Sequence, residues 1–159
     1  MLSRVKIEKA PDVYSWSVKG KKAYDQKNYA EALKWLRPVL EMENKKPELT
    51  RNEWHDVVNW TGISEAGLNN MEGAAKVFND AIKKNGDYAL FSYNLACVRA
   101  EQNNNAEALM LLEKALKQRA ELDRGRHLPD PQADSSFRGL KNDARFLELL
   151  RKYRLSSDK

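Results

Sequence analysis

The chain has 159 residues, a formal net charge of +5, a single cysteine and hydrophobic residues at 42% of its positions. This length allows about one domain, the single cysteine excludes an internal disulfide, and no run approaches the ~18 apolar residues of a membrane span. With 32% charged residues, 7 glycines and 5 prolines, the composition predicts a helical cytoplasmic protein that is not embedded in a membrane. Residues 1–10 are basic with no apolar run after them, so we expect an N-terminal extension and not a secretory signal.

The positive charge lies at the two ends of the chain. Residues 1–50 carry 11 Lys and Arg against 7 Asp and Glu, and residues 117–159 carry the same numbers. Residues 51–116 carry 6 against 9. Nucleic-acid-binding surfaces usually gather basic and aromatic residues into one stripe, which this chain lacks. Binding of RNA or an anionic surface is therefore the least favoured function.

The first predicted unit, residues 11–44, is a hairpin of two amphipathic helices. Its second helix is "YAEALKWLRPVL", whose core-facing stripe is Ala32, Leu36, Val39 and Leu40. Its first helix is "YSWSVKGKKAY", in which the small residue Gly20 lies twelve positions before Ala32. Pro38 lies inside the second helix and predicts that this helix kinks or ends near Arg37.

An insertion of eight residues follows, within "EMENKKPELTRNE" (41–53). Lys46 precedes Pro47, which disfavours helical backbone at Lys46 and predicts a break there. "TRNE", from Thr50 to Glu53, has the capping-box pattern that begins a helix. We expect a longer loop and then an early start to the next helix.

Two further copies of the hairpin follow, at residues 51–86 and 87–120. Their first helices are expected in "VVNWTGISEAG" and "FSYNLACVRAE", and their second helices in "MEGAAKVFNDAI" and "NAEALMLLEKAL". The apolar stripes of the second helices are Ala74, Phe78, Ala81 and Ile82, then Ala108, Leu112, Ala115 and Leu116. The turns of the three hairpins, "QKN", "LNN" and "NNN", are rich in asparagine, which tolerates left-handed backbone at a helix end.

The spacing between these copies points to a repeat family. Gly62 and Ala96 are 34 residues apart, and so are Ala74 and Ala108. A helix–turn–helix unit of this period resembles the tetratricopeptide repeat, over roughly residues 11–116. The resemblance implies an all-α fold in which antiparallel helical hairpins stack into a right-handed superhelix, or solenoid.

The last segment, residues 121–159, is expected to be a loop followed by a capping helix. "RGRHLPDPQAD" is polar and contains two prolines, as loops often do. Asp143 is well placed to cap a helix with an apolar face at Phe146, Leu149, Leu150 and Tyr153. A repeat array needs such a helix because its last apolar face is otherwise exposed to water.

The resemblance also implies a binding surface. Family members bind peptides or partner helices on a concave face lined by the first helix of each repeat. The corresponding residues are Tyr14, Ser17, Lys21 and Tyr24, then Asp56, Asn59, Trp60 and Ile63, then Leu90, Tyr93, Asn94 and Cys97. Aromatic rings and amides suit a peptide groove. The alternative for rings such as Trp60 and Tyr24 is packing between helices.

One family ligand is disfavoured. Members that hold the C-terminal tail of a chaperone use a clamp of Lys and Asn in the first repeat, Asn in the second, and Lys and Arg in the third. The corresponding residues here are Ser17 and Lys21, then Trp60, then Leu90 and Asn94, and none has the type that the clamp requires at its own position. A buried carboxylate without paired cations is costly, so we do not expect a chaperone-tail receptor.

No sequence pattern indicates an enzyme, a cofactor or a metal site. His55 and His127 are far apart, and Cys97 has no second cysteine with which to complete a zinc site. There is no glycine-rich phosphate loop and no nucleophile elbow. We expect a non-enzymatic adaptor that binds a peptide or helical segment of another protein. The alternative is a self-associating structural subunit, that is, a homo-oligomer.

Overall fold

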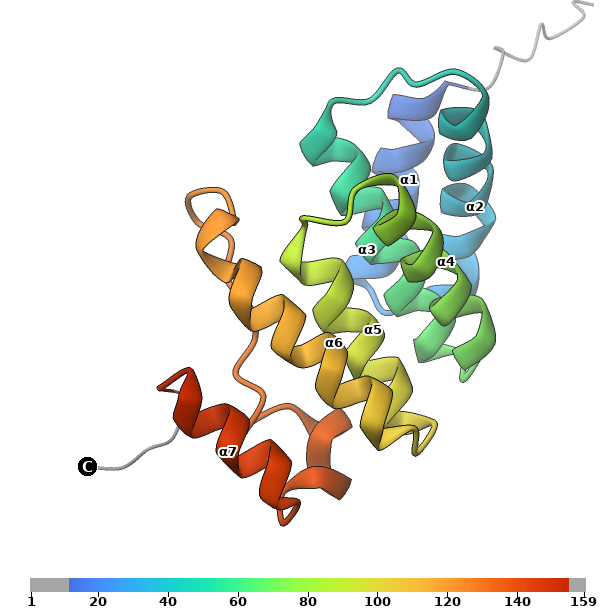
Figure 1. Ribbon diagram of the computed structural model, residues 1–159. Helices are drawn as coiled ribbons and strands as arrows, with labels where there is room; N and C mark the ends of the chain where they lie inside the picture. The colour runs from blue at the N-terminus through green and yellow to red at the C-terminus, as the bar shows by residue number, and fades with distance from the viewer. Residues whose placement is uncertain (1–11, 155–159) are drawn as a thin grey trace, which may run out of the picture.

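The computed structural model describes residues 12–154, and the regular elements in that range are all helical (Figure 1). The helices are α1 (Val13–Asp25), α2 (Tyr29–Lys45), α3 (Arg51–Gly67), α4 (Met71–Lys84), α5 (Ala89–Glu101), α6 (Asn105–Gln118), η1 (Arg119–Glu121), η2 (Ser135–Leu140) and α7 (Ala144–Lys152), where η denotes a 3-10 helix. The predicted all-α class is confirmed for this part of the chain. The expectations for residues 1–11 and 155–159 lie outside the described residues. No helix between residues 12 and 154 has the length and apolar character needed to cross a membrane.

The first six helices form three pairs, each joined by a short turn. Within the pairs α1 packs on α2, α3 on α4 and α5 on α6. Successive pairs meet where α2 contacts α3 and where α4 contacts α5. Because α3 also contacts both α1 and α5, these three helices lie side by side (Figure 1). We call the surface that they form the α1/α3/α5 face.

The turns inside the three pairs share one conformation. Each has a residue in the left-handed region of backbone space, at Lys27, Asn69 and Asn103. The next residue is an asparagine whose side chain accepts a backbone N–H of the following helix, at Asn28, Asn70 and Asn104. The predicted left-handed asparagines are confirmed in the second and third turns. The capping asparagines were not predicted.

The predicted apolar stripes form the core between the helices. All twelve stripe residues are buried except Leu40 and Ile82, which are half-buried. Close approach explains two glycines of the first helices. A Cβ atom on Gly20 would lie 2.4 Å from Leu36 Cδ2, and one on Gly62 would lie 2.3 Å from Phe78 Cζ. A side chain at either position would therefore overlap the second helix of its own pair.

The insertion is mostly helical. When α2 is aligned with α4 and α3 with α5, α2 extends three residues further at its C-terminal end and α3 begins four residues earlier than α5. The loop between α2 and α3 is one residue longer than the loop between α4 and α5. The early start of α3 and the capping box between Thr50 and Glu53 are confirmed. The expected longer loop is longer by only one residue, because α2 continues to Lys45 before the break at Lys46.

Pro38 does not end α2, so of the two predicted effects near Arg37, a kink or an end, the end is wrong and the kink stays a prediction. Proline removes one N–H, and the carbonyl that loses its helical partner belongs to Lys34, which is an exposed residue and open to water. Leu36 and Val39, on either side of the proline, are fully buried. Their packing holds the helix together across a position that local propensity disfavours.

The loop between α2 and α3 is held by a buried carboxylate. Glu43 is only 2% exposed, and its Oε1 accepts the backbone N–H groups of Glu48 at 2.9 Å and Leu49 at 3.1 Å. Two loop donors that no helix satisfies are thereby paired. This contact has no signal in the local sequence pattern.

We expect Glu43→Ala to lower the free energy of unfolding by about 1–2 kcal/mol, because two loop N–H groups lose their acceptor. Glu43→Gln keeps a side-chain oxygen and should cost less. Glu41→Ala, at an exposed position of the same helix, is the matched control. Urea unfolding of the four proteins measures the effect. Equal stability of Glu43→Ala and Glu41→Ala would show that the carboxylate does not hold the loop.

Candidate functional site

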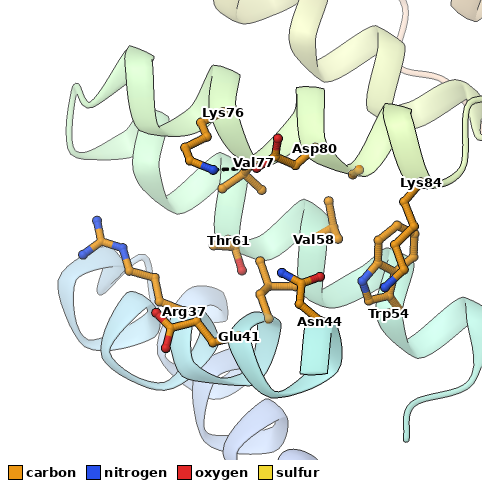
Figure 2. Close-up of a pocket in the computed structure, with 12 residues that line it drawn as sticks. Arg37, Glu41, Asn44, Trp54, Val58, Thr61, Lys76, Val77, Asp80 and Lys84 are labelled. Atoms are coloured by element: carbon orange, nitrogen blue, oxygen red, sulfur yellow. Dashed lines mark hydrogen bonds and ion pairs between the residues drawn. The ribbon is translucent and has the colours of Figure 1, made fainter. Parts of the chain in front are cut away.

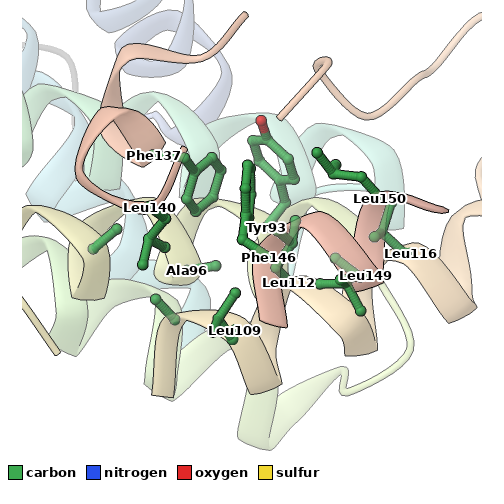
Figure 3. Packing of buried hydrophobic residues seen from close by; sticks show 13 residues of the cluster. Tyr93, Ala96, Leu109, Leu112, Leu116, Phe137, Leu140, Phe146, Leu149 and Leu150 are labelled. Carbon is green, nitrogen blue, oxygen red and sulfur yellow. The ribbon is translucent and has the colours of Figure 1, made fainter. Parts of the chain in front are cut away.

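The chain turns back over α5 after α6, and η2 and α7 form a cap. Phe137 of η2 is 0% exposed, and its ring lies edge-on to Tyr93 at 5.8 Å and tilted against Phe146 at 5.9 Å, measured between ring centroids (Figure 3). The predicted apolar face of the last helix is buried in the same cluster, through Phe146, Leu149 and Leu150. The predicted N-cap Asp143 is confirmed, since its side chain accepts the Arg145 N–H.

The cap buries one predicted site residue, Tyr93. Tyr93 is only 1% exposed, so the expectation that its ring is open to a ligand is wrong. Its hydroxyl donates to Asp134 Oδ2 at 2.9 Å, and η2 covers its ring. Cys97, one turn along α5, donates its thiol to the same oxygen at 3.7 Å. Burial raises the pKa of the Cys97 thiol well above its usual range, so the thiol stays protonated.

The polar segment before η2, residues 124–134, is non-helical, as predicted. It is attached to the helices by hydrogen bonds of Arg126. Arg126 donates to Asp56 Oδ1 of α3 at 2.7 Å and to the Tyr88 hydroxyl at 2.8 Å. The hydrogen bond to Asp56 raises the pKa of Arg126 above its already high value. Asp56, a predicted site residue, is therefore already paired with a cation of its own chain.

Five predicted site residues line one open cleft between α1 and α3. They are Tyr14, Ser17, Lys21, Asp56 and Trp60. We call this space, of about 170 Å³, the α1/α3 cleft. It is smaller than the ~300 Å³ at which small-molecule pockets begin, so its size suits one protein side chain.

Part of the wall of the α1/α3 cleft is apolar, and its apolar side chains are partly exposed. Val18 is 68% exposed and Tyr14 is 46% exposed, although the Tyr14 hydroxyl is fixed by donating to the Glu48 carbonyl at 2.6 Å. Trp60 is half-buried, with the Tyr24 ring at 6.4 Å and the Lys21 ammonium at 5.8 Å from its ring. Trp60 thus packs against a neighbouring helix and lines the cleft as well.

A second open cleft, of about 400 Å³, lies further along α3. It includes the predicted residues Ile63, Asn94 and Cys97, and we call it the α3/α5 cleft. The Asn94 side chain also donates to Asn59 Oδ1 at 2.9 Å, which links α5 to α3. Leu90 lines neither cleft and is half-buried against the core cluster that contains Trp54 and Phe91.

The residues that line these clefts without having been predicted as site residues include Val18, Glu53, Glu101 and Asp134. Glu53 could have been predicted from the sequence, because it lies on one helical stripe with the predicted residues Asp56, Trp60 and Ile63. Val18 lies one turn from Tyr14 on α1. Asp134 comes from the C-terminal segment, and no local pattern places it beside α5.

A third cleft lies between α2 and α4, over α3, and it differs in charge (Figure 2). Its volume is about 270 Å³. Lys76 pairs with Asp80 at 2.6 Å on one side, and the Lys84 ammonium lies 4.9 Å from the Trp54 ring. Arg37, also on its rim, makes a forked pair with the buried Glu65 at 2.7 and 2.8 Å. The cations of this cleft therefore already have partners in the chain.

His55 is a packing residue. Its ring is buried, stacks on Tyr88 with centroids 3.7 Å apart, and its Nε2 lies 2.7 Å from the Asn85 side-chain nitrogen. Burial lowers the pKa of His55 to about 4, so the ring is neutral at neutral pH. Within residues 12–154, no group of three His, Cys, Asp or Glu side chains is placed to hold a metal ion.

No protein-family model matches this sequence, and a search of curated proteins finds no match. The candidate site is therefore defined by the geometry of the α1/α3/α5 face.

Proposed function

We propose that this protein is a non-enzymatic interaction module that binds a peptide or helical segment of another protein on the α1/α3/α5 face. We further propose that its three helix pairs are tetratricopeptide-type repeats in a right-handed solenoid, closed by the C-terminal cap. The 34-residue spacing and the shared turn conformation of the pairs support this architecture.

The observation that carries the proposal is the α1/α3 cleft. Val18 and Tyr14 are exposed apolar side chains beside the half-buried Trp60. Clustered exposed apolar residues often mark binding sites, and isolated ones do not. Polar side chains, including Ser17 and Lys21, lie at the same cleft. An apolar centre with polar groups around it is the usual composition of a protein–protein interface.

The partner occupies only part of the face in this proposal. The cap covers Tyr93 on α5, so the partner lies over α1 and α3 and reaches α5 at the α3/α5 cleft. A shallow surface of this kind has to overcome the cost of ordering a peptide. We expect dissociation constants of about 1 μM, which is roughly −8 kcal/mol.

Selection of peptides from a random 12-residue display library tests the proposal without a known partner. Peptides selected on the wild type should bind Trp60→Ala at least about tenfold more weakly, because truncating a buried aromatic anchor commonly costs more than ~1.4 kcal/mol. Trp35→Ala is the matched control, since Trp35 is also half-buried but packs on Trp16, away from both clefts. Titration calorimetry gives the affinities, and circular dichroism confirms that both variants are folded. Peptides that bind both variants as well as the wild type would place the binding surface elsewhere.

A further inference from the structure

The clefts of the α1/α3/α5 face have the opposite charge from the whole chain. The net charge of the protein is +5. The two clefts are nevertheless lined by four carboxylates, Glu53, Asp56, Glu101 and Asp134, and by a single cation, Lys21. The partner chemistry that follows from this charge rests on the proposed function.

Three of these carboxylates have no ion-pair partner in the part of the chain that the structure describes. Asp56 is neutralised by Arg126, and Lys21 is paired with Asp25. For Glu53, Glu101 and Asp134, no Lys, Arg or His nitrogen among residues 12–154 lies within 4.0 Å. Within residues 12–154, the linings of the two clefts therefore keep three carboxylates that no cation neutralises.

Neutral donors hold two of these carboxylates in place. Glu53 accepts hydrogen bonds from the Thr50 hydroxyl at 2.7 Å and the Thr50 N–H at 2.8 Å, and these bonds lower the pKa of Glu53. Asp134 accepts the Tyr93 hydroxyl at 2.9 Å, the Cys97 thiol at 3.7 Å and the Ser136 N–H at 3.0 Å. A carboxylate has about four lone-pair sites, so each can still accept a cationic donor from a partner.

Apolar and aromatic groups lie along the same surface. Trp60 and Ile63 follow Glu53 on one stripe of α3, and the exposed Val18 faces the first of the two clefts. Aromatic faces such as that of Trp60 also attract ammonium and guanidinium groups. The surface therefore offers one apolar binding site for a side chain, in the α1/α3 cleft. Negative charge lies beside it at Glu53, and further along the surface, in the α3/α5 cleft, at Glu101 and Asp134.

We infer that the partner of this face is a basic protein segment, in which one apolar side chain enters the α1/α3 cleft and flanking Lys or Arg residues pair with Glu53, Glu101 and Asp134. Nucleic acids and acidic peptides are repelled by the same carboxylates. The cleft between α2 and α4 does not favour a basic segment, because its lining carries three cations, Arg37, Lys76 and Lys84, against the two carboxylates Glu41 and Asp80. Exposed ion pairs contribute at most about fivefold each to affinity, so they act mainly on partner choice and association rate.

The charge of the selected peptides tests this inference. Peptides enriched on the wild type should have a net positive charge and an aliphatic or aromatic residue between Lys or Arg residues. Glu101→Lys should weaken their binding about five- to tenfold at 50 mM salt, because it converts an attraction at an exposed position into a repulsion. Glu41→Lys, which makes the same charge change in the cleft between α2 and α4, should change binding less than twofold. The difference between these variants should shrink in 0.5 M salt as the charges are screened.

The outcomes separate this inference from the proposed function. Acidic or uncharged peptides that still lose binding to Trp60→Ala would overturn the basic partner and leave the binding face intact. Equal weakening by Glu101→Lys and Glu41→Lys would also overturn it, because the effect would then follow from net charge alone. Peptides that are unaffected by Trp60→Ala, or a library from which nothing is enriched, would overturn both.

Discussion

Phe137→Ala is expected to lower the free energy of unfolding by about 3–5 kcal/mol, the cost of removing a fully buried aromatic side chain. Phe137 has no exposed surface and contacts Tyr93 of α5 and Phe146 of α7. It is the residue through which η2 covers α5. Its loss should leave a cavity between these elements and loosen the contact of Asp134 with the Tyr93 hydroxyl. Guanidinium unfolding followed by circular dichroism measures the change.

Phe137→Leu is the control, because it keeps an apolar side chain and should cost clearly less than the alanine variant. Hydrogen exchange locates the effect. Amide protection should fall in α5 and α7 more than in α1 and α2, whose buried residues belong to a different core cluster from Phe137. An alanine variant within 1 kcal/mol of the wild type would contradict the packing of the cap on α5.

Gly62→Val is expected to destabilise the protein by about 3 kcal/mol, at the upper end of the usual cost of overpacking a core. A Cβ atom at this position lies 2.3 Å from Phe78 Cζ, and the two further methyl groups of valine reach deeper into the ring. Phe78 is 1% exposed, so its ring has little room to move. Thermal or urea unfolding gives the value.

In the third unit, Ala96 and Leu112 occupy the positions that Gly62 and Phe78 occupy in the second unit. A larger residue at position 62 could therefore be compensated by a smaller one at position 78. Gly62→Ala should be unfavourable or neutral in the wild type, because a gain of about 1 kcal/mol in helix propensity is offset by the clash with Phe78. In a Phe78→Leu background the ring atoms that cause the clash are gone, and Gly62→Ala should become stabilising. Gly139→Val is the control for valine itself, since nothing lies within 4 Å of a Cβ there. Additive effects of Gly62→Ala and Phe78→Leu would show that the two positions do not meet.

The helices could be predicted because their signals are local. Stripes such as Ala108, Leu112, Ala115 and Leu116 repeat with the helical period, and all four are buried. The asparagine turns carry their own backbone preference, and the left-handed residues at Asn69 and Asn103 follow it. Local propensity was misleading at Pro38, because burial of Leu36 and Val39 outweighs the missing hydrogen bond.

The candidate site could be predicted only in part, for a physical reason. Helical register places Tyr14, Lys21 and Trp60 on one side of their helices, and the contact of α1 with α3 brings them to one cleft. What covers such a face depends on contacts between residues far apart in the chain. Arg126 reaches Asp56, and Asp134 reaches Tyr93, across separations of 70 and 41 residues. No pattern within α5 indicates that Tyr93 is covered in this way.

The most direct test of the central claim is an NMR titration of the wild-type protein with a peptide selected on it. We expect the resonances of the Trp60 indole N–H and of the amides of Val18, Lys21 and Glu53 to shift on binding. The resonances of the Trp35 indole N–H, and of the Glu41 and Asp80 amides at the cleft between α2 and α4, should not shift. Shifts centred on Glu41 and Asp80, with Trp60 unchanged, would contradict the assignment of the α1/α3/α5 face as the binding surface.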